Sequence, residues 1–274
     1  MCSTLEAEGY DVHLVGRKLK DSQPLDRTYK THRTILLINK GAFFFAEYNF
    51  RLFWHLLFKK IDVLHANDLD TLLANYLVSK IKRIPLIYDS HEYFTGVPEI
   101  QNKKFVKGVW TTIEKWIFPK LKHTFTVNES IADLFEKDYG IRPQVIRNIP
   151  IQHTTLWQKT KSDLELPEDK RILVLQGAGI NMDRGAEELL EAMVHLDNYL
   201  LLIIGTGDVI EALIKRAQKP DLKDKIIFKG KLPYEEMMQY TQLADAGLTL
   251  DKDTNINYRF SLPNKVFDYI RAQT

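Results

Sequence analysis

The sequence predicts an α/β protein made of two Rossmann-like domains that a linker joins. Short β-rich runs alternate with longer helical patterns along most of the chain, and this alternation is typical of parallel sheets. A polar stretch interrupts the alternation after Pro150, and the same pattern then restarts. The length of 274 residues is sufficient for two domains of ordinary size. We therefore expect domains over residues 1–150 and 169–274, with a linker over 151–168.

The first domain has five expected strands, each a short run rich in β-branched, aromatic or aliphatic residues. They are Val12–Gly16, Thr34–Asn39, Ile61–Ala66, Leu86–Asp89 and His123–Val127. The segments between most of them have helical spacing, which is the usual connection between parallel strands. The chain opens on a segment that resembles the end of a helix with Gly9 as its C-cap. Since such a domain normally has a strand before this helix, we expect the first strand to be missing.

The second domain repeats the alternation of strands and helices. The expected strands are Ile172–Gln176, Leu200–Ile204, Ile226–Phe228 and Ala246–Leu250. The expected helices are Ala186–Met193, Val209–Ala217, Tyr234–Leu243 and Lys265–Arg271. The chain ends just after the last of these helices has begun, so we expect this domain to lack its C-terminal part and both domains to be incomplete.

Composition excludes several classes of protein. The chain carries 38 Lys and Arg against 36 Asp and Glu, which argues against a nucleic-acid partner. Its single cysteine, Cys2, cannot form an internal disulfide or a thiolate metal cluster, as expected in a reducing cytoplasm. The start of the chain has no apolar signal segment, and Glu47, Arg51 and His55 interrupt the longest apolar tract. We therefore expect a cytoplasmic protein without a membrane-spanning helix.

A glycine-rich turn follows the expected strand Ile172–Gln176. Gly177 and Gly179 in this turn would let the backbone approach a phosphate group at a helix N-terminus. Arg184 comes just before that helix, and its guanidinium matches phosphate oxygens. The spacing is not G-x-G-x-x-G, so a tight turn without a ligand is an equally good interpretation. Gly207, in the next turn of this kind, has the same two interpretations, and the structural one is favoured there.

The stretch Ser261–Tyr269 is the most informative part of the sequence. Pro263 is suited to the first turn of a helix, and Lys265 and Asp268 would then lie on one face near its positive end. In this position the lysine would suit a diphosphate and the carboxylate would suit ribose hydroxyls. The alternative is a surface ion pair that contributes roughly a few tenths of a kcal/mol to stability.

Histidine and aspartate residues follow two expected strands of the first domain. His91 follows Leu86–Asp89, at the carboxyl edge where α/β sheets place their ligands, so it is a candidate for contacting a substrate. A loop histidine that neighbouring side chains satisfy is the alternative, and His65 within a strand is expected to be structural.

Two Asp-x-Asp pairs have a spacing that can hold Mg²⁺ or Mn²⁺ against a diphosphate: Asp68–Asp70 and Asp251–Asp253. Such spacings are common by chance, and Asp70 is expected to be a helix N-cap. We therefore expect no metal site.

Eight segments together resemble the family 4 (group 1) retaining glycosyltransferases of the GT-B fold. They are His65–Leu77, Pro85–Phe94, Thr124–Gly140, Val145–Pro150, Leu175–Met193, Leu201–Gly207, Ile226–Leu250 and Ser261–Tyr269. Their order and spacing are more specific than any one of them. The resemblance implies two domains that face each other across a cleft. It implies a nucleotide-sugar donor in the second half, a glycan or lipid-linked acceptor in the first, and a role in cell-surface polysaccharide biosynthesis.

The resemblance also implies roles for single residues. Asp268 matches the second acid of the family's E-x7-E motif, which holds the ribose, and Asn264 and Lys265 fit the Asn-Lys variant of that motif. Arg184 matches the basic residue before the phosphate-facing helix, and His91 matches a histidine beside the donor sugar. The implied catalytic residues are thus His91, Arg184 and Lys265, and the reaction needs no cofactor and no metal.

The sequence departs from the family pattern at three places. Phe260 stands where the first Glu of the motif is usual, Gly179 stands where many members have Arg, and the N-terminal glycine-rich loop is absent. Two alternatives stay open: a non-catalytic protein of the same fold that binds a nucleotide or a partner, and a nucleotide-sugar epimerase. A dehydrogenase is weaker still, because Asp197 lies before the next strand and not at its end.

The segment 102–122 is a candidate for contact with a membrane. It carries six lysines and one acidic residue, Glu114, and its apolar positions 106, 109, 110, 113, 116 and 117 have helical spacing. This composition is typical of a helix on an anionic bilayer, although a helix packed against its own domain is equally consistent. In the rival segment Gly41–Lys60 the polar residues form one narrow stripe, which predicts a buried helix. We expect peripheral association with the inner face of the cell membrane through residues 102–122.

Overall fold

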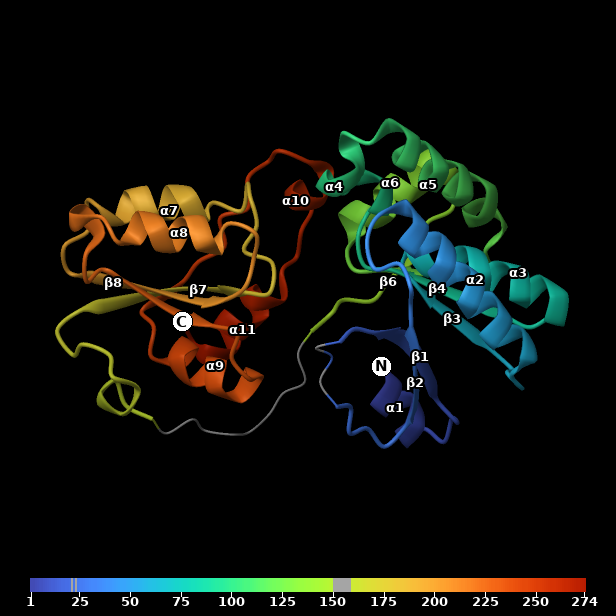
Figure 1. Ribbon diagram of the computed structural model, residues 1–274, viewed down its shortest axis with the longest axis horizontal. Coiled ribbons are helices and arrows are strands. Elements are labelled where there is room, and N and C mark those ends of the chain that lie inside the picture. Colours follow the sequence, from blue (N-terminus) through green and yellow to red (C-terminus); the bar gives the residue numbers. More distant parts are fainter. Residues whose placement is uncertain (21, 23, 150–158) are drawn as a thin grey trace. The chain divides into compact units, whose positions relative to one another are not determined.

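The computed structural model divides the chain into two compact α/β units (Figure 1). It describes residues 1–20, 22, 24–149 and 159–274. Unit 1 comprises Met1–Thr95, Glu99–Thr126 and Ala132–Gln144. Unit 2 comprises Gly96–Pro98, Val127–Ile131 and Val145–Thr274. Most of the predicted linker, residues 150–158, lies outside the described residues. In the described end of this linker, Leu164 and Leu166 are buried in the core of unit 2, so the linker's end packs on that unit.

Up to residue 149 the chain alternates strands with helices. The strands are β1 (His13–Lys18), β2 (Lys30–Ile35), β3 (Leu64–Asn67), β4 (Leu86–Ser90), β5 (His123–Thr126) and β6 (Gln144–Val145). The α-helices are α1 (Cys2–Ala7), α2 (Ala42–Phe58), α3 (Leu69–Lys82), α4 (Pro98–Gln101), α5 (Lys104–Ile117) and α6 (Glu129–Tyr139). Single 3₁₀ turns lie at Phe94–Gly96 and Phe118–Lys120.

These strands form two sheets. One contains β1 and β2, and the other has the order β3-β4-β5-β6. The pairs β1–β2, β3–β4 and β4–β5 are parallel. The register aligns Asn67 with Asp89 and Ser90 with Thr126, so the residues after β3 and β4 meet at one edge. Parallel pairing thus brings together side chains that are about twenty positions apart in the sequence.

The second strand of the chain differs from its prediction. The sequence predicts a strand over Thr34–Asn39, but β2 ends at Ile35. The backbone N–H groups of Leu37 and Ile38 donate to the carboxylate of Glu47, at 2.8–3.1 Å, in place of a neighbouring strand. A side chain on α2 therefore satisfies the backbone groups that a longer strand would have paired.

Residues 159–274 form the second series of elements. The strands are β7 (Arg171–Gly177), β8 (Tyr199–Gly205), β9 (Ile226–Gly230) and β10 (Ala246–Gly247). The α-helices are α7 (Ala186–Met193), α8 (Ile210–Ala217), α9 (Tyr234–Gln242), α10 (Ile256–Arg259) and α11 (Asn264–Ala272). Single 3₁₀ turns lie at Ser162–Leu164 and Pro220–Leu222.

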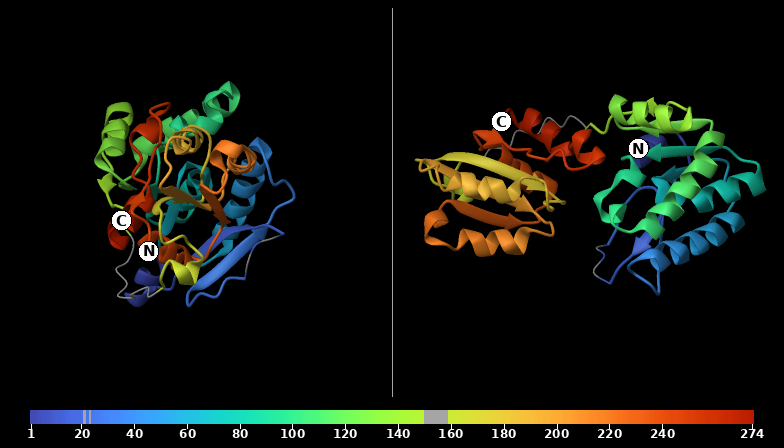
Figure 2. Two further views of the ribbon diagram at one scale, coloured as in Figure 1. Left: turned by 90° about the vertical axis from the view of Figure 1, so that its left-hand side faces the viewer. Right: turned by 90° about the horizontal axis from the view of Figure 1, so that it is seen from above.

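The sheet of unit 2 is parallel, with the order β10-β7-β8-β9. Helices α7 and α8 cover one face, and α9 and α11 cover the other (Figure 1). Figure 2 shows α7 and α8 end-on beside the strands in its left panel. Because β8 is buried on both faces, its sequence is one continuous apolar run. Parallel sheets in both units confirm the predicted α/β class.

Candidate functional site

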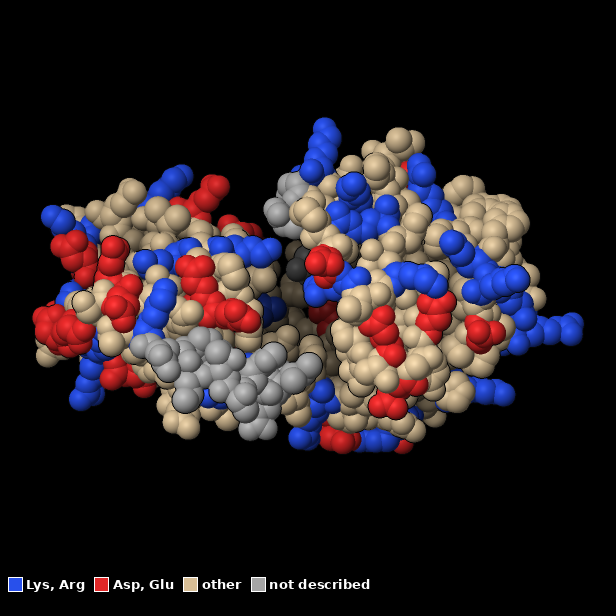
Figure 3. Space-filling model, turned by 90° about the horizontal axis from the view of Figure 1, so that it is seen from below, with Lys and Arg blue, Asp and Glu red and all other residues tan. Residues whose placement is uncertain are grey.

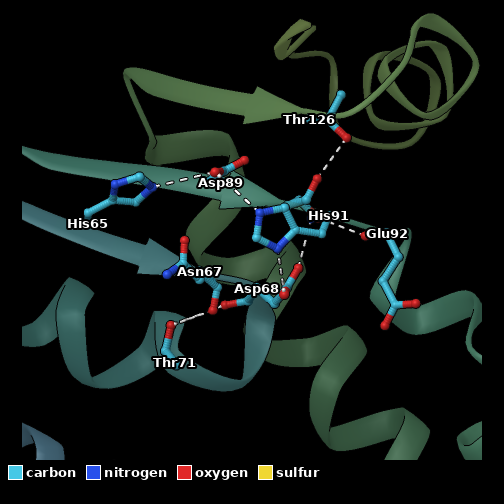
Figure 4. A network of polar contacts seen from close by, with 9 residues as sticks. His65, Asn67, Asp68, Thr71, Asp89, His91, Glu92 and Thr126 are labelled. Atoms are coloured by element: carbon cyan, nitrogen blue, oxygen red, sulfur yellow. Dashed lines mark hydrogen bonds and ion pairs between the residues drawn. The ribbon is translucent and has the colours of Figure 1, made fainter. Parts of the chain in front are cut away.

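Two histidines and two aspartates gather at the carboxyl ends of β3 and β4 (Figure 4). His65 lies in β3, Asp68 follows that strand, Asp89 lies in β4 and His91 follows it. The parallel register of β3 and β4 places these residues side by side, as the sheet-edge argument for His91 predicts.

The ring of His91 lies between two carboxylates. Its Nδ1 is 3.2 Å from Asp68 Oδ2, and its Nε2 is 3.4 Å from Asp89 Oδ2. The backbone N–H of His91 also donates to Asp68 Oδ1 at 2.8 Å. On the far side of Asp89, His65 Nε2 lies 3.6 Å from Asp89 Oδ2. His65 thus contacts the same carboxylate as His91, and a structural role for His65 stays a prediction.

These contacts favour the charged form of the imidazole. Hydrogen bonds to Asp68 and Asp89 raise the pKa of His91 to about 10, against the opposing effect of burial. Burial alone would raise the pKa of Asp89, but the nearby imidazoles of His65 and His91 hold it well below its usual value. The side chain of His91 is 46% exposed, so this cation is fixed in direction and still open to a ligand.

Asp68, and not Asp70, stands at the start of α3. The N-cap predicted at Asp70 is wrong: the cap residue is Asp68, which has a positive φ of 58°. Its side chain makes no capping hydrogen bond, because its carboxylate is directed at His91. Burial first, and then the neighbouring Asp68, raise the pKa of Asp70 to about 6. The two carboxylates of this Asp-x-Asp pair thus have different surroundings: that of Asp68 contacts His91, and that of Asp70 is largely buried.

In unit 2, the two glycine turns that follow β7 and β8 interlock. The N–H of Thr206 donates to Gly177 O at 3.1 Å, and the N–H of Ile180 donates to Thr206 O at 3.0 Å. A Cβ on Gly207 would lie 1.9 Å from Ile180 O, whereas a Cβ on Gly179 would have its nearest neighbour at 3.8 Å. Gly207 is thus required by backbone packing, while the space beside Gly179 is open.

Two cations lie at the carboxyl end of the unit 2 sheet. Arg184 precedes α7, where its guanidinium stacks 4.7 Å above the ring of Tyr258 and lies 3.6 Å from Asp251. Lys265 lies in the first turn of α11; burial lowers its pKa, Asp251 opposes this shift and Arg184 adds to it. Its ammonium group makes no hydrogen bond with any of the described residues. Two helix N-termini and two partly buried cations around one carboxylate form a site that is suited to an anion.

The carboxylate of Asp268 is buried, with 7% of the residue exposed. Its Oδ1 accepts from the Tyr234 hydroxyl at 2.7 Å, and its Oδ2 accepts from Gln176 Nε2 at 3.3 Å. Thr241 in turn donates to Gln176 Oε1 at 2.6 Å. The surface ion pair with Lys265, which was the alternative interpretation, is excluded by this burial. Pro263 also lies one residue before α11, at its N-cap, and not in the first turn.

The basic segment 102–122 folds largely as α5. Of its predicted apolar stripe, Trp110 and Ile117 are buried, and Trp110 packs against the rings of Phe45 and Phe94. Val109 and Trp116 are exposed. Much of the predicted stripe therefore faces the interior of its own unit.

The sequence did not predict the partners of the candidate residues. Asp68 and Asp89 hold His91, Asp251 and Tyr258 hold Arg184, and Tyr234 holds Asp268. For Asp68 a signal was present, because it directly follows a strand that is expected to lie beside the strand of His91. Within the described ranges, no group of three or more His, Cys, Asp or Glu residues is arranged to hold a metal ion.

Comparisons with known proteins identify the family of this chain. The model of glycosyltransferase family 4 matches residues 1–150, and the model of glycosyl transferases group 1 matches residues 158–250. The comparison with curated proteins finds no match.

Solved structures share the fold at low sequence identity. Sucrose-phosphate synthase from Thermosynechococcus elongatus is 17% identical, with a TM-score of 0.69 over 90% of this chain and 67% of its own. A glycosyltransferase from Rickettsia africae is 13% identical, with a TM-score of 0.61 over 90% of this chain and 66% of its own. HepE from Anabaena is 14% identical, with a TM-score of 0.59 over 80% of this chain and 60% of its own. This chain spans about two thirds of the length of the first two. Because the first family model covers more than half of the residues, the chain belongs to glycosyltransferase family 4.

Proposed function

We propose that this chain transfers a sugar from a nucleotide-sugar donor to a glycan or lipid-linked acceptor, with retention of the anomeric configuration. The observation that carries the proposal is the pair of partly buried cations, Arg184 and Lys265, at the carboxyl end of the unit 2 sheet. A nucleotide diphosphate is the anion that such a site suits. In support, the Anabaena structure contains UDP and glucose, and the pneumococcal O-GlcNAc transferase GtfA was solved with UDP and GlcNAc.

The proposed roles follow from the chemistry of each group. Gly177 and Gly179 leave room for the diphosphate, and Arg184 and Lys265 stabilise the negative charge that develops on it as the glycosidic bond breaks. Asp268 holds the ribose, and Asn264 and Gly207 complete the donor side. The departing diphosphate accepts the proton of the attacking acceptor hydroxyl, so that no protein carboxylate forms a bond to the sugar.

His91 acts on the acceptor side in this proposal. Both of its ring nitrogens face carboxylates, so the ring is a fixed donor and cation and not a mobile base. A ring that is fixed beside the donor sugar would help to position the sugar for attack by the acceptor.

Nucleotide release from a mixture of UDP-, GDP- and dTDP-sugars tests the proposal. The wild-type chain should release one nucleotide in the presence of an acceptor. Arg184→Ala should lower the rate by about 100-fold or more, because one well-placed charge donor contributes roughly 3–4 kcal/mol to the transition state. Arg184→Lys keeps the positive charge but loses the two-pronged guanidinium, so its rate should lie between those of wild type and Arg184→Ala. Nucleotide binding without any release would instead support a non-catalytic protein of this fold.

We further propose that the reaction takes place at the inner face of the cell membrane, in cell-surface polysaccharide biosynthesis. No helix among the described residues is both long and apolar enough to cross a bilayer. The lysines of segment 102–122 would attract anionic lipids, at about 1 kcal/mol each. Cosedimentation with anionic vesicles should therefore weaken when Lys103, Lys104, Lys107 and Lys115 are replaced by Gln. Binding that this change leaves unaltered would contradict the role of the segment.

A further inference from the structure

Helix α2 exposes an entirely apolar face to solvent. Its exposed positions are Ala42, Phe43, Ala46, Phe50, Trp54 and Phe58. The four aromatic residues are 75%, 64%, 44% and 80% exposed, in that order. Five of the six positions follow one another at intervals of four, so they form one stripe along the helix. The expectation of a buried helix in this segment therefore holds for one side of α2 only.

The aromatic stripe is not needed for packing within unit 1. The opposite side of α2 supplies the buried residues Tyr48, Asn49, Leu52 and Leu56. Asn49 ties the helix to α3, because its Nδ2 donates to Asp70 O at 2.7 Å and its Oδ1 accepts from the N–H of Ala74 at 3.2 Å. Since the fold uses one side of α2, the exposed aromatic side chains call for another explanation.

The loop before α2 enlarges the apolar surface and hides its one acidic group. Glu47 lies within the stripe, but its carboxylate accepts from the N–H groups of Leu37 and Ile38 and from Arg51 Nε at 2.7 Å. These bonds hold the loop against the helix, where Leu37 is 83% exposed and Ile38 is 43% exposed. The negative charge is thus covered while further aliphatic surface is added beside the aromatic rings.

The segment of the sequence that contains the stripe has an excess of basic residues. Residues 27–61 contain seven Lys and Arg, and Glu47 is their only acidic residue. Lys59 and Lys60 follow the last exposed ring, and Lys82 donates to the carbonyl of Lys59. On the face shown in Figure 3, Lys and Arg side chains gather over the upper part of the right-hand unit, which is unit 1. Aromatic residues with cations beside them match the boundary between the headgroups and acyl chains of an anionic bilayer.

We propose that the exposed face of α2 inserts into the surface of an anionic phospholipid bilayer, with Phe43, Phe50, Trp54 and Phe58 as its anchors. A second copy of this chain is a poorer occupant of the face, because pairing it with itself would bring two positively charged surfaces together. This inference rests on the membrane association in the proposed function and adds that α2 is the helix that inserts. The lysines of segment 102–122 then supply only long-range attraction to the anionic surface. It does not depend on sugar transfer.

The test compares two matched pairs of exposed aromatic residues on neighbouring helices. Phe58 and Phe105 are each 80% exposed, and Trp54 and Trp116 are 44% and 46% exposed. Cosedimentation of the full chain uses vesicles of phosphatidylcholine and phosphatidylglycerol. Trp54→Ser/Phe58→Ser removes two of the proposed anchors and should weaken partitioning into vesicles at least about tenfold, while Phe105→Ser/Trp116→Ser on α5 should stay close to wild type.

A second measurement locates the inserted ring. Lipids that carry bromine on their acyl chains should quench the fluorescence of wild-type chain, and Trp54→Phe should remove most of this quenching while Trp116→Phe keeps it. Circular dichroism confirms that each variant is folded. Equal loss of binding in both serine pairs, or quenching that follows Trp116, would overturn the assignment to α2. So would a dimer in sedimentation velocity that Trp54→Ser/Phe58→Ser abolishes while vesicle binding is unchanged.

Discussion

At the scale of single residues, His91 depends on Asp68 for its charge. Asp68→Asn should lower the pKa of His91 from about 10 toward the ordinary histidine value, because the largest favourable contact would be lost. Proton NMR titration of the imidazole signals measures this shift. Asp62→Asn is the control, since it removes the same charge from an exposed position outside the network. A titration of His91 that both variants leave at the wild-type midpoint would contradict the network.

The raised pKa also sets the pH range in which the histidine stabilises the fold. A folded pKa above the unfolded value of about 6.5 means that the charged form is favoured in the folded state. The contribution is complete below that unfolded value and disappears as the pH rises through about 10. The difference in unfolding free energy between wild type and His91→Ala, followed by urea denaturation, should therefore shrink between neutral and alkaline pH. A difference that stays constant over this pH range would show that the ring is already uncharged at neutral pH.

Asp268 offers a different kind of test, because its carboxylate already has protein partners. If it also holds ribose, Asp268→Ala should weaken nucleotide binding by ~1.5–3 kcal/mol, which is typical of hydrogen bonds to a charged group. Calorimetric titration with the nucleotide measures the change. Tyr234→Phe removes the 2.7 Å hydrogen bond but keeps the carboxylate, so it should lower stability and leave affinity unchanged. If Asp268→Ala leaves the nucleotide affinity unaltered, the role of Asp268 is purely structural.

Sequence reasoning found candidate residues more readily than their partners. His91 and Arg184 stand out because each lies at the end of a predicted element. Asp68 and Tyr258 lie 23 and 74 positions away from them, and only the pairing of strands or the path of a long loop brings them close. Contacts of this kind depend on tertiary structure, which local sequence patterns do not contain.

At the scale of the elements, the glycine turns can be separated into structural and ligand-binding positions. Gly207→Ala should lower the free energy of unfolding by at least about 2 kcal/mol, because its new methyl group meets a carbonyl oxygen. Gly179→Ala has open space and should change stability by less than about 1 kcal/mol. If the diphosphate lies there, Gly179→Ala should instead weaken nucleotide binding. Thermal unfolding measures the structural role and calorimetry measures the ligand-binding role. A Gly179→Ala variant that is unstable but binds nucleotide normally would show that Gly179 is structural.

The hydrophobic pattern predicted elements well where one side of the element is buried and the other faces water. Helix α7 matches its predicted bounds, since one side packs on a sheet and the other faces water. Helix α2 did not follow the same logic. Both of its sides are apolar, and a sequence pattern alone cannot distinguish a helix that is buried on all sides from one with an exposed apolar face.

At the scale of the whole molecule, the proposed reaction runs without a metal ion. Sugar transfer should therefore survive an excess of EDTA. The second Asp-x-Asp pair is already engaged, because Asp251 lies 3.6 Å from Arg184 and Asp253 accepts from Arg259 at 2.6 and 2.7 Å. Activity that EDTA abolishes and Mn²⁺ restores would contradict the proposal and assign a cation to one of the two pairs.

The alternation of strands and helices was sufficient to predict two parallel α/β units. It could not predict that short pieces of the first half, Gly96–Pro98 and Val127–Ile131, group with unit 2. It also could not predict that β1 and β2 form a sheet of their own. Both features depend on how the segments pack in three dimensions, which local patterns do not contain.

The interlocked turns after β7 and β8 have a consequence for the thermodynamics of ligand binding. Thr206 bonds to the backbone on both sides of Ala178 and Gly179, so the phosphate-facing turn is held in shape before any ligand arrives. A turn that is already ordered loses little conformational entropy when it binds. Any change that loosens the turn at Thr206 should therefore make nucleotide binding entropically less favourable. The turn after β8 would thus preorganise the turn after β7 for its ligand.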